Sequence, residues 1–473
     1  MNTRLNGNDL LAIGYSEGKI MGLALGLLAG HKDLPAEEAL VLLKMIREHP
    51  ENFLDDEKWE VLATAMIEDA RASREETIAL REEVNEYAVY GADFIEEGAI
   101  KQMEIAMRLP VTVAGALMPD AHQGYGLPIG GVLAVRNAVI PYGVGVDIGC
   151  RMALSVFDIP EAHFLENQAK YKRELIAHTK FGAGGGFHGQ YKSDHPVLDR
   201  KEFAMTPFIK QLHDKAYSQL GSSGGGNHFA EWGIIEFGGR DEPLNVEKGR
   251  YLALLTHSGS RGFGATIAGH YTRLAKDICK LPKEAVNLAY LDLDSEAGQE
   301  YWLAMNLAGD YASACHEIIH QKLTKAVGGN MIAKIENHHN FAWKEIWKDE
   351  EVVVHRKGAT PAGKGVMGII PGSMTAPGFL VRGRGESKAI HSASHGAGRQ
   401  MSRTKAIQNI TREEMKAILK EHAVTLIGAG LDEAPMAYKD IHQVMAAQTE
   451  LVDTVATFYP KMVRMADDGS KED

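Results

Sequence analysis

The first part of the chain carries hydrophobic residues at the spacing of amphipathic helices. In "LPAEEALVLLKMIREHP", Leu40, Leu43 and Ile46 recur every three residues, and a proline stands near each end of the segment. Apolar residues three and four positions apart lie on one face of a helix, and such prolines mark helix ends. The same pattern recurs in "DDEKWEVLATAMIEDA" and in the charged "SREETIALREEVNEY". We therefore expect residues 1–88 to form a small helical N-terminal module, and we identify no catalytic motif in it.

From residue 89 the pattern changes to short apolar runs that end in glycine-rich turns. Examples are "VTVAGALMPDAHQGYGLPIGGVLAV", "RYLALLTHSGSRGFG", "EVVVHRKGATPAG" and "GFLVRGRG". Helical segments intervene, as in "PFIKQLHDKAYSQL" and "EAGQEYWLAMNLAGDYASACHEIIHQKLTKAV". This mixture predicts an α+β fold. Because no internal repeat or long linker interrupts it, we expect residues 89–473 to form one large core with central β-sheets and surrounding helices.

Composition narrows the class of protein. The 473 residues are 45% hydrophobic and 24% charged, which is ordinary for a globular protein. No stretch reaches the roughly 18 uninterrupted apolar residues of a membrane helix, and "MNTRLNGNDL" does not start a secretory signal. We therefore expect a cytoplasmic protein without a membrane span. The net charge of −12 excludes a broadly basic nucleic-acid coat but leaves room for a local basic groove.

Three cysteines are too few and too scattered for a disulfide framework. Cys279 and Cys315 stand in helix-like segments, where we expect them to be buried in the core. Cys150 differs because it shares the glycine-rich stretch "VGVDIGCRM" with Asp147. Taken alone, this stretch favours a buried cysteine beside a turn aspartate. Combined with imidazoles from distant segments, the pair forms a sulfur, nitrogen and oxygen ligand set that suits zinc, manganese or iron.

Histidines recur in five glycine-rich clusters, which we expect to lie in loops. A single histidine is more often structural than a ligand. Five of them beside small residues, which let the backbone approach a ligand closely, favour a binding site. The clusters are "PDAHQGYG" with His122, "GGGNHFAE" with His228, "THSGSRGFG" with His257, "ENHHN" with His338 and His339, and "SASHGAGR" with His395.

Glycine-rich runs with basic residues indicate a second chemistry, the binding of phosphate. Arg261 stands in "HSGSRGFG", Lys357 in "HRKGATPAG", and Arg399 and Arg403 in "SHGAGRQMSR". Backbone N–H groups in such turns and arginine forks match the geometry of phosphate oxygens. The Walker A pattern is absent, so P-loop chemistry is not expected.

Taken together, these stretches resemble one family, the RtcB RNA ligases, which join RNA ends with GTP and manganese. The matching motifs occur in the family's order and span roughly residues 90 to 450. They are "MPDAHQGYGLPIGGV", "GVGVDIGCRM", "GGGNHFAE", "HSGSRGFG", "HHN", "RKGAT", "IIPGSM", "SHGAGRQMSRTKA" and "PMAYKDI".

The resemblance implies a centre of two manganese ions and a covalent nucleotide intermediate. It implies that the Cys150 thiolate bridges both ions, and that His395 attacks the α-phosphate of GTP and carries the guanylyl group. The implied metal ligands are Asp147, Cys150, His228, His257 and His339.

The resemblance also implies how the nucleotide and the RNA bind. The substrates would be RNA with a 3′-phosphate or 2′,3′-cyclic phosphate end and RNA with a 5′-hydroxyl end, in tRNA splicing or RNA repair. Whether an archease-like activating protein is needed stays open. Guanylate contacts would come from Asn227, Phe229, Glu231, Ser373 and Tyr438, and contacts to RNA or triphosphate oxygens from Arg261, Lys357, Arg399 and Arg403.

The chain departs from the family at two places. Family members commonly end in a lysine and glycine that recognise guanine, whereas this chain has Met465 near the lysine position and ends "ADDGSKED". Arg151 follows Cys150, where glycine is common. The missing lysine favours an alternative function, a metal-dependent phosphoesterase that acts on RNA ends without nucleotide transfer. A second alternative is a non-catalytic RNA-binding paralogue, against which the retained cysteine, aspartate and histidines argue.

Overall fold

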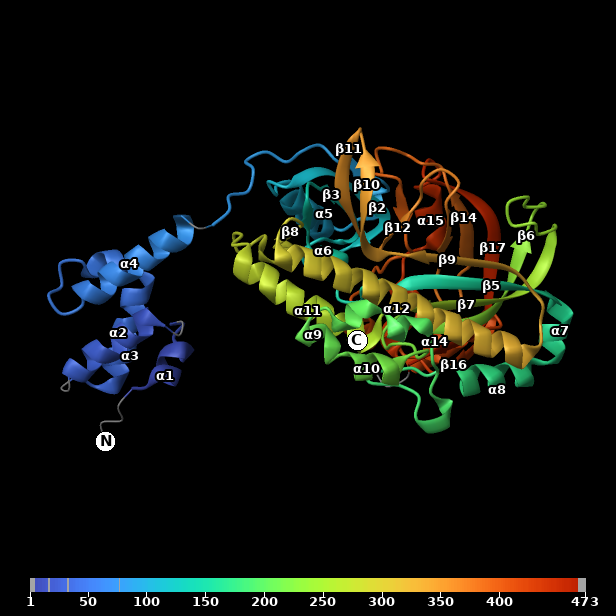
Figure 1. Ribbon diagram of the computed structural model, residues 1–473, viewed down its shortest axis with the longest axis horizontal. Helices are drawn as coiled ribbons and strands as arrows, with labels where there is room; N and C mark the ends of the chain where they lie inside the picture. The colour runs from blue at the N-terminus through green and yellow to red at the C-terminus, as the bar shows by residue number, and fades with distance from the viewer. Residues whose placement is uncertain (1–4, 16–17, 32–33, 76, 467–473) are drawn as a thin grey trace. The chain divides into compact units, whose positions relative to one another are not determined.

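The computed structural model describes residues 5–15, 18–31, 34–75 and 77–466 (Figure 1). The chain divides into two compact units, Met1–Ile78 and Ala79–Asp473, each of which is described separately. Among the described residues, no helix is long and apolar enough to cross a membrane.

The smaller unit is helical, as the hydrophobic spacing predicts. Leu43 and Ile46 are fully buried in its core, beside Leu10 and Leu62. The prediction of a helix over "SREETIALREEVNEY" is wrong from Thr77 onward, where the described residues are not helical, and the last helix of the unit ends at Glu75. The helices are α1 (Gly7–Ala12), α2 (Lys19–Gly30), α3 (Ala36–Glu48) and α4 (Glu60–Glu75), with a 3₁₀ turn, η1 (Pro50–Phe53).

The segment after α4 makes hydrogen bonds that compete with a helix. The Arg81 backbone N–H donates to the Arg108 carbonyl at 2.8 Å, and the Arg108 side chain donates back to the Arg81 carbonyl at 2.8 Å. Since backbone groups satisfied by a distant partner need no helical one, these contacts account for the non-helical backbone here.

Two sheets form the frame of the larger unit. The five-stranded sheet has the order β1-β2-β3-β11-β10: β1 (Ala88–Val89), β2 (Thr112–His122), β3 (Ile129–Val135), β11 (Glu350–Lys357) and β10 (Asn340–Trp347). The eight-stranded sheet has the order β13-β14-β17-β6-β7-β5-β9, with β16 paired to β17: β13 (Met367–Ile370), β14 (Gly378–Gly383), β17 (Val452–Met465), β6 (Phe229–Phe237), β7 (Gly249–Ser258), β5 (Arg151–Pro160), β9 (Met331–His338) and β16 (Thr425–Ile427). Two small pairs complete the strands: β12 (Ala359–Pro361) with β15 (Ser392–Ser394), and β4 (Ala138–Val139) with β8 (Leu291–Asp292).

One residue joins the two sheets on the path from β9 to β10. Strand β9 ends at His338 in the eight-stranded sheet, and β10 begins at Asn340 in the five-stranded sheet. The chain therefore passes from one sheet to the other at His339.

The long helix α12 (Glu296–Val327) crosses the eight-stranded sheet and contacts β5 and β7 (Figure 1). Its bounds match the predicted segment because both ends carry local signals: the Ser295 hydroxyl accepts from the Gly298 N–H, and Gly328 adopts the left-handed conformation. Helices α11 (Arg261–Ile278) and α8 (Gln168–His178) pack against it.

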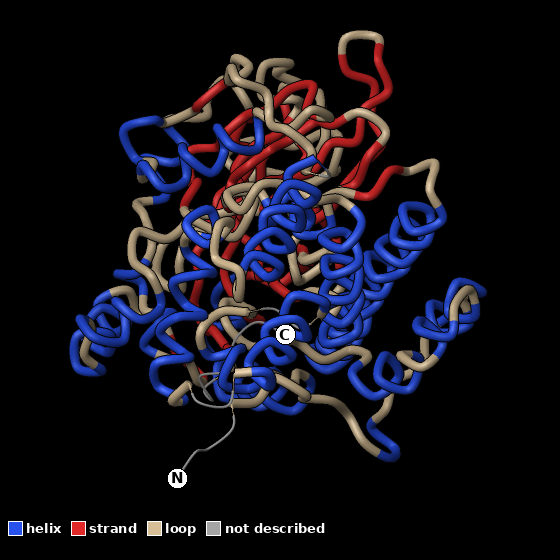
Figure 2. The backbone as a smooth tube through the Cα atoms, turned by 90° about the vertical axis from the view of Figure 1, so that its left-hand side faces the viewer, coloured by secondary structure: helices blue, strands red, loops and turns tan. Residues whose placement is uncertain are grey.

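Helices border the strands of this unit, as Figure 2 shows in blue and red. The predicted α+β core with central sheets is therefore confirmed. The helix predicted over "PFIKQLHDKAYSQL" is divided into two, α9 and α10. The remaining helices are α5 (Glu97–Met107), α6 (Pro141–Val144), α7 (Glu161–Glu166), α9 (Pro207–Lys210), α10 (His213–Gln219), α13 (Arg403–Asn409), α14 (Arg412–Glu421) and α15 (Ile441–Ala446).

Candidate active site

The strands of both sheets end around one cavity of about 1300 Å³. Most of the residues singled out from the sequence line it, although they come from eight separate stretches of the chain. Two predicted site residues do not line the cavity: the His228 side chain is 1% exposed, and Arg261 is fully buried. The predicted residues on the lining are Asp147, Cys150, Asn227, Phe229, Glu231, His257, His339, Lys357, Ser373, His395, Arg399, Arg403 and Tyr438.

A buried cluster of ligand-type atoms centres on the Cys150 thiol. Its Sγ lies 3.1 Å from Nε2 of His257, which lies 3.2 Å from Nε2 of His339. On the other side, Sγ lies 3.4 Å from Nε2 of His228, which lies 3.0 Å from a carboxylate oxygen of Asp147. These residues form two groups, each able to hold a metal ion, and Cys150 belongs to both.

The protonation states of the cluster suit a divalent cation. Burial lowers the pKa of both His257 and His339 well below its usual value, so both imidazoles are neutral. The His257 Nδ1–H donates to the Asn227 carbonyl at 3.2 Å, which leaves the Nε2 lone pair facing Cys150. Burial alone would raise the pKa of Asp147, but the hydrogen bond and charge of His228 lower it. One thiol sulfur, three imidazole nitrogens and one carboxylate fit manganese, zinc or iron.

Backbone contacts hold the loop of Asp147 and Cys150 in place. The Ser260 N–H donates to Oδ1 of Asp147 at 2.9 Å, and the His339 N–H donates to the Cys150 carbonyl at 3.0 Å. A side chain at Gly259 would place its Cβ about 2 Å from the Asp147 carboxylate, so only glycine leaves room for that carboxylate. The loop is therefore tied both to the start of α11 and to the joint between the sheets.

A chain of hydrogen bonds with defined donors and acceptors connects β7 and β5 to helix α12. The Ser258 carbonyl can only accept, so the His316 Nε2–H donates to it at 3.1 Å. His316 Nδ1 then accepts from the Thr256 hydroxyl at 2.7 Å, whose oxygen accepts from the His320 Nε2–H at 2.8 Å. His320 Nδ1 accepts from the Ser155 hydroxyl at 2.7 Å. These contacts bracket His257 and fix the strand that carries it.

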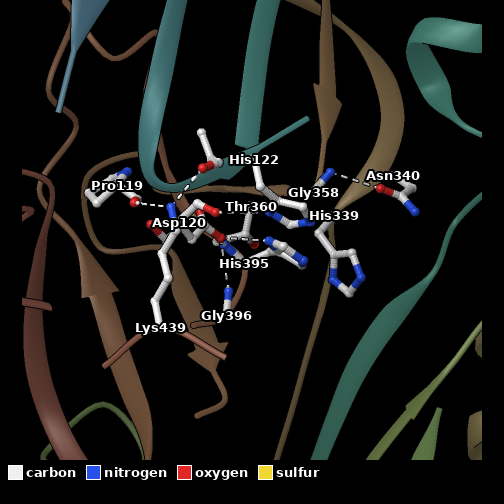
Figure 3. A network of polar contacts seen from close by, with 12 residues as sticks. Pro119, Asp120, His122, His339, Asn340, Gly358, Thr360, His395, Gly396 and Lys439 are labelled. Carbon is white, nitrogen blue, oxygen red and sulfur yellow. Dashed lines mark hydrogen bonds and ion pairs between the residues drawn. The ribbon is translucent and has the colours of Figure 1, made fainter. Parts of the chain in front are cut away.

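His395 is paired with a carboxylate that our sequence analysis did not single out. Figure 3 shows Asp120 and His395 with their polar contacts. One carboxylate oxygen of Asp120 accepts from Nδ1–H of His395 at 2.7 Å and from the backbone N–H of His395 and Gly396 at 3.0 and 3.3 Å. Nε2 is the ring nitrogen of His395 that does not contact Asp120, and the ring lies 5.0 Å from the ring of His339.

Lys439 holds the backbone on both sides of Asp120. Its Nζ donates to the carbonyls of Pro119 and Ala121, which flank Asp120, at 3.3 and 2.7 Å (Figure 3). Burial would raise the pKa of Asp120, but the nearby His395 and Lys439 lower it, so Asp120 is a carboxylate. The sequence signal was present, since an aspartate inside the apolar run "ALMPDAH" is unusual for a strand.

The predicted loop placement of the histidines is wrong for three of them. His122 ends β2, His257 is the last residue but one of β7, and His338 ends β9. In β7, for example, His257 still pairs with Met152 of β5, and the first glycine, Gly259, comes only after the last paired residue, Ser258. His338 stacks on Trp343 with ring centres 4.9 Å apart and does not line the cavity.

Two predicted phosphate-binding residues are hydrogen-bonded to backbone. The Arg261 guanidinium donates to the Gly182 carbonyl at 2.9 Å and to the Ser222 hydroxyl at 3.1 Å. The Lys357 Nζ donates to the carbonyls of Tyr125 and Tyr142 at 2.5 and 3.2 Å, and burial lowers its pKa to about 7. Both side chains therefore hold loops together in this structure.

A second charged group lines the cavity near the C-terminal strands. Arg399 and Arg403 both pair with the buried Glu433, which also accepts from the Tyr438 hydroxyl. Arg403 additionally contacts Asp432 at 2.7 Å. Burial raises the pKa of Glu433, although both arginines oppose this effect.

The predicted nucleotide contact Glu231 is a buried acid that lines the cavity. Glu231 is 4% exposed, and burial raises its pKa well above 4.5. Within the described residues, no hydrogen bond reaches its carboxyl, and the buried Asn227 Oδ1 also has no partner. Met465 lines the same cavity. Arg151 does not line it, because its guanidinium donates to the Gly309 carbonyl at 2.8 Å in α12.

Comparison with known proteins agrees with this geometry. Residues 102–466 match the family model described as tRNA-splicing ligase RtcB. An RNA-splicing ligase RtcB1 of Escherichia coli is 32% identical over 395 residues, covering 77% of this chain and 93% of the relative. The RNA-splicing ligase RtcB of Escherichia coli K12 is 33% identical over the same shares of both chains. A tRNA-splicing ligase RtcB of Nanoarchaeum equitans is 30% identical over 432 residues, covering 77% and 90%.

Proposed function

The chain belongs to the RtcB family of RNA ligases, and from that premise we propose the reaction that its cavity performs. It joins RNA ends carrying a 3′-phosphate or 2′,3′-cyclic phosphate to 5′-hydroxyl ends, through a guanylylated His395 and a centre of two manganese ions. The observation that carries this proposal is the Asp120–His395 pair beside two ligand groups that share Cys150. The biological setting that we propose is tRNA splicing or RNA repair.

The metal centre uses the two groups of the buried cluster. Asp147, Cys150 and His228 would hold one ion, and Cys150, His257 and His339 the other, with the thiolate shared. Bound ions of this kind neutralise phosphate charge and align an in-line displacement. Manganese follows from the family resemblance, since the donor types suit zinc and iron as well.

His395 is the nucleophile of the first step. Its Nε2 lone pair attacks the α-phosphorus of GTP, a P–N bond forms, the bond to the β-phosphate oxygen breaks, and pyrophosphate leaves. The imidazole becomes positively charged as the bond forms, while its Nδ1–H stays hydrogen-bonded to Asp120 at 2.7 Å. The carboxylate therefore orients the ring and stabilises the charge that develops on it.

The guanylyl group then activates the RNA. An oxygen of the 3′-phosphate attacks the guanylyl phosphorus, the P–N bond breaks, and Nε2 regains its lone pair. The 5′-hydroxyl oxygen of the second RNA attacks the activated 3′-phosphorus, the bond from that phosphorus to the guanylate oxygen breaks, GMP leaves, and the hydroxyl proton passes to solvent. An end with a 2′,3′-cyclic phosphate is first hydrolysed to the 3′-phosphate by water.

The guanine would bind beside Glu231, whose buried carboxyl lacks a partner. The N–H edge of guanine offers two donors that match one carboxylate, and burial leaves Glu231 few other means of charge stabilisation. Asn227, Phe229, Ser373 and Tyr438 line the same cavity and supply amide, hydroxyl and aromatic contacts. Adenine offers a different pattern there, so base choice is a direct test of this pocket.

The test is covalent labelling of the protein. We expect label from α-labelled GTP, given with Mn²⁺, to stay on the denatured wild-type chain and to be absent from His395→Ala. Label from ATP instead would keep the transfer chemistry and change the assigned base. No label from either nucleotide, with metal bound and RNA ends still hydrolysed, would replace the ligase proposal by the metal-dependent phosphoesterase.

A further inference from the structure

A second cavity of about 310 Å³ adjoins the first one. Tyr125, Tyr142 and Val146 line both, so the two cavities meet along these residues. Val146 directly precedes Asp147 of the proposed metal centre. An extended ligand that runs from the metal centre past Val146 therefore enters the second cavity.

The two tyrosines form a fixed aromatic surface. Their ring centres lie 6.2 Å apart with an angle of 21° between the planes, and Tyr125 is 69% exposed. Lys357 donates to both tyrosine carbonyls and so ties the two backbones together from below. Gly126 lets the loop of Tyr125 approach closely, because a Cβ there would lie 2.8 Å from the Asn287 carbonyl. The loop is therefore held in place although its tyrosine ring is exposed.

Basic side chains from α11 border this surface. Lys276 lies over the Tyr142 ring at 5.7 Å, and its Nζ donates to the Asn287 side chain at 2.7 Å. Arg273 is exposed and, among the described residues, has no hydrogen bond or ion pair. The described lining of this cavity includes both cations and no acidic residue.

We propose that Tyr125, Tyr142, Arg273 and Lys276 bind the unpaired RNA nucleotides next to the reacting end. Aromatic rings stack on bases irrespective of sequence, and nearby cations bind the phosphates between those bases. A volume of about 310 Å³ has room for about one nucleotide. This inference rests on the proposed function, because it takes RNA as the substrate of the adjoining cavity.

The test compares RNA binding by matched tyrosine variants of the full chain. The probe is a fluorescent single-stranded RNA with a 3′-phosphate, and the readout is its dissociation constant by anisotropy. Tyr125→Ala should weaken binding about tenfold, since stacking of one base contributes on the order of 1–3 kcal/mol. Tyr191 is 68% exposed and lines neither cavity, so Tyr191→Ala is the control and should bind within about twofold of wild type.

A second variant tests the phosphate contact. Arg273→Gln should reduce by about one the slope of log affinity against log salt, because one fewer phosphate is neutralised. Wild-type affinity and salt slope in both Tyr125→Ala and Arg273→Gln would overturn the proposal, as would an equal loss in Tyr191→Ala. Both positions are exposed, so the variants should unfold at the wild-type temperature.

Guanylyl labelling separates this inference from the function on which it rests. If wild type takes label from GTP while Tyr125→Ala binds RNA normally, the RNA subsite is wrong and the ligase proposal stands. If wild type takes no label while Tyr125→Ala still loses RNA affinity, the ligase mechanism is wrong and the subsite stands.

Discussion

Replacing Asp120 by asparagine tests the charge that the carboxylate places beside His395. One oxygen of Asp120 accepts all three hydrogen bonds from His395 and Gly396, and the other oxygen has no partner. An asparagine with its carbonyl oxygen in the first position keeps the three hydrogen bonds, the imidazole tautomer and the ring orientation. Only the negative charge is lost, so the variant isolates the electrostatic part of the interaction.

The magnitude follows from the Nδ1–H contact at 2.7 Å. A hydrogen bond to a charged group contributes about 1.5–3 kcal/mol and one between neutral groups about 0.5–1.5 kcal/mol, so loss of the charge alone removes about 1–1.5 kcal/mol. Because the imidazole gains positive charge during the attack on GTP, and about 1.4 kcal/mol corresponds to tenfold in rate, Asp120→Asn should slow formation of the labelled adduct about 5- to 13-fold. The buried amide N–H₂ without a partner should also lower stability by about 1–3 kcal/mol.

The assay is the single-turnover rate of label transfer from α-labelled GTP, with metal content and unfolding measured on the same preparation. Asp241 is a matched control, since it is 8% exposed and pairs with Arg382 at 2.6 Å outside the lining of both cavities. Asp241→Asn should lose stability and keep the labelling rate. A rate for Asp120→Asn within about twofold of wild type, with metal bound, would refute the reasoning.

Three further changes test other parts of the cavity. Cys150→Ser removes the sulfur shared by both ligand groups, so metal analysis should show loss of both ions per chain, and full metal content would contradict a bridging thiolate. Glu433→Gln removes the buried carboxylate that the partly exposed Arg399 and Arg403 share, while Arg403 keeps its contact with Asp432, so it should cost about 1–3 kcal/mol in denaturant unfolding, whereas no measurable loss would mean that water already screens the group. Burial raises the folded-state pKa of Glu231 above 4.5, so the folded chain keeps a proton that the unfolded chain releases as pH rises past that value. Stability contributed by this group therefore falls with rising pH. Glu231→Gln should gain stability over wild type as the pH rises above 4.5, and a pH-independent difference would contradict the shift.

The elements that the sequence predicted well have their determinants close by in the chain. Helix α12 has its periodicity, its Ser295 cap and its Gly328 terminus within or next to one segment. The helix predicted beyond Glu75 fails because its competitor is Arg108, which no local pattern reveals. Strand ends were placed too early for the same reason, since pairing with a distant strand carries the backbone past the last apolar residue.

The candidate site shows the same difference between residues whose role is visible in the local sequence and residues whose role depends on distant partners. Residue types and family motifs led to Cys150 and His395, whose chemistry is distinctive in a glycine-rich context. Asp120 stands out locally as an aspartate inside an apolar run, but its role comes from a histidine 275 positions away. Arg261 is the opposite case, because its glycine-rich surroundings predicted a phosphate contact. In the structure its guanidinium instead links the segments of Gly182 and Ser222. Which partner a charged side chain meets depends on the tertiary fold, and local sequence does not encode it.

The single residue between β9 and β10 limits how this protein can change in length. His339 contributes an imidazole to the Cys150 cluster and is also the whole connection between β9 and β10, which belong to different sheets. Inserting or deleting one residue there would shift β10 by one position against β11 and turn each of its side chains to the opposite face. Evolution and engineering can therefore alter this connection by substitution alone.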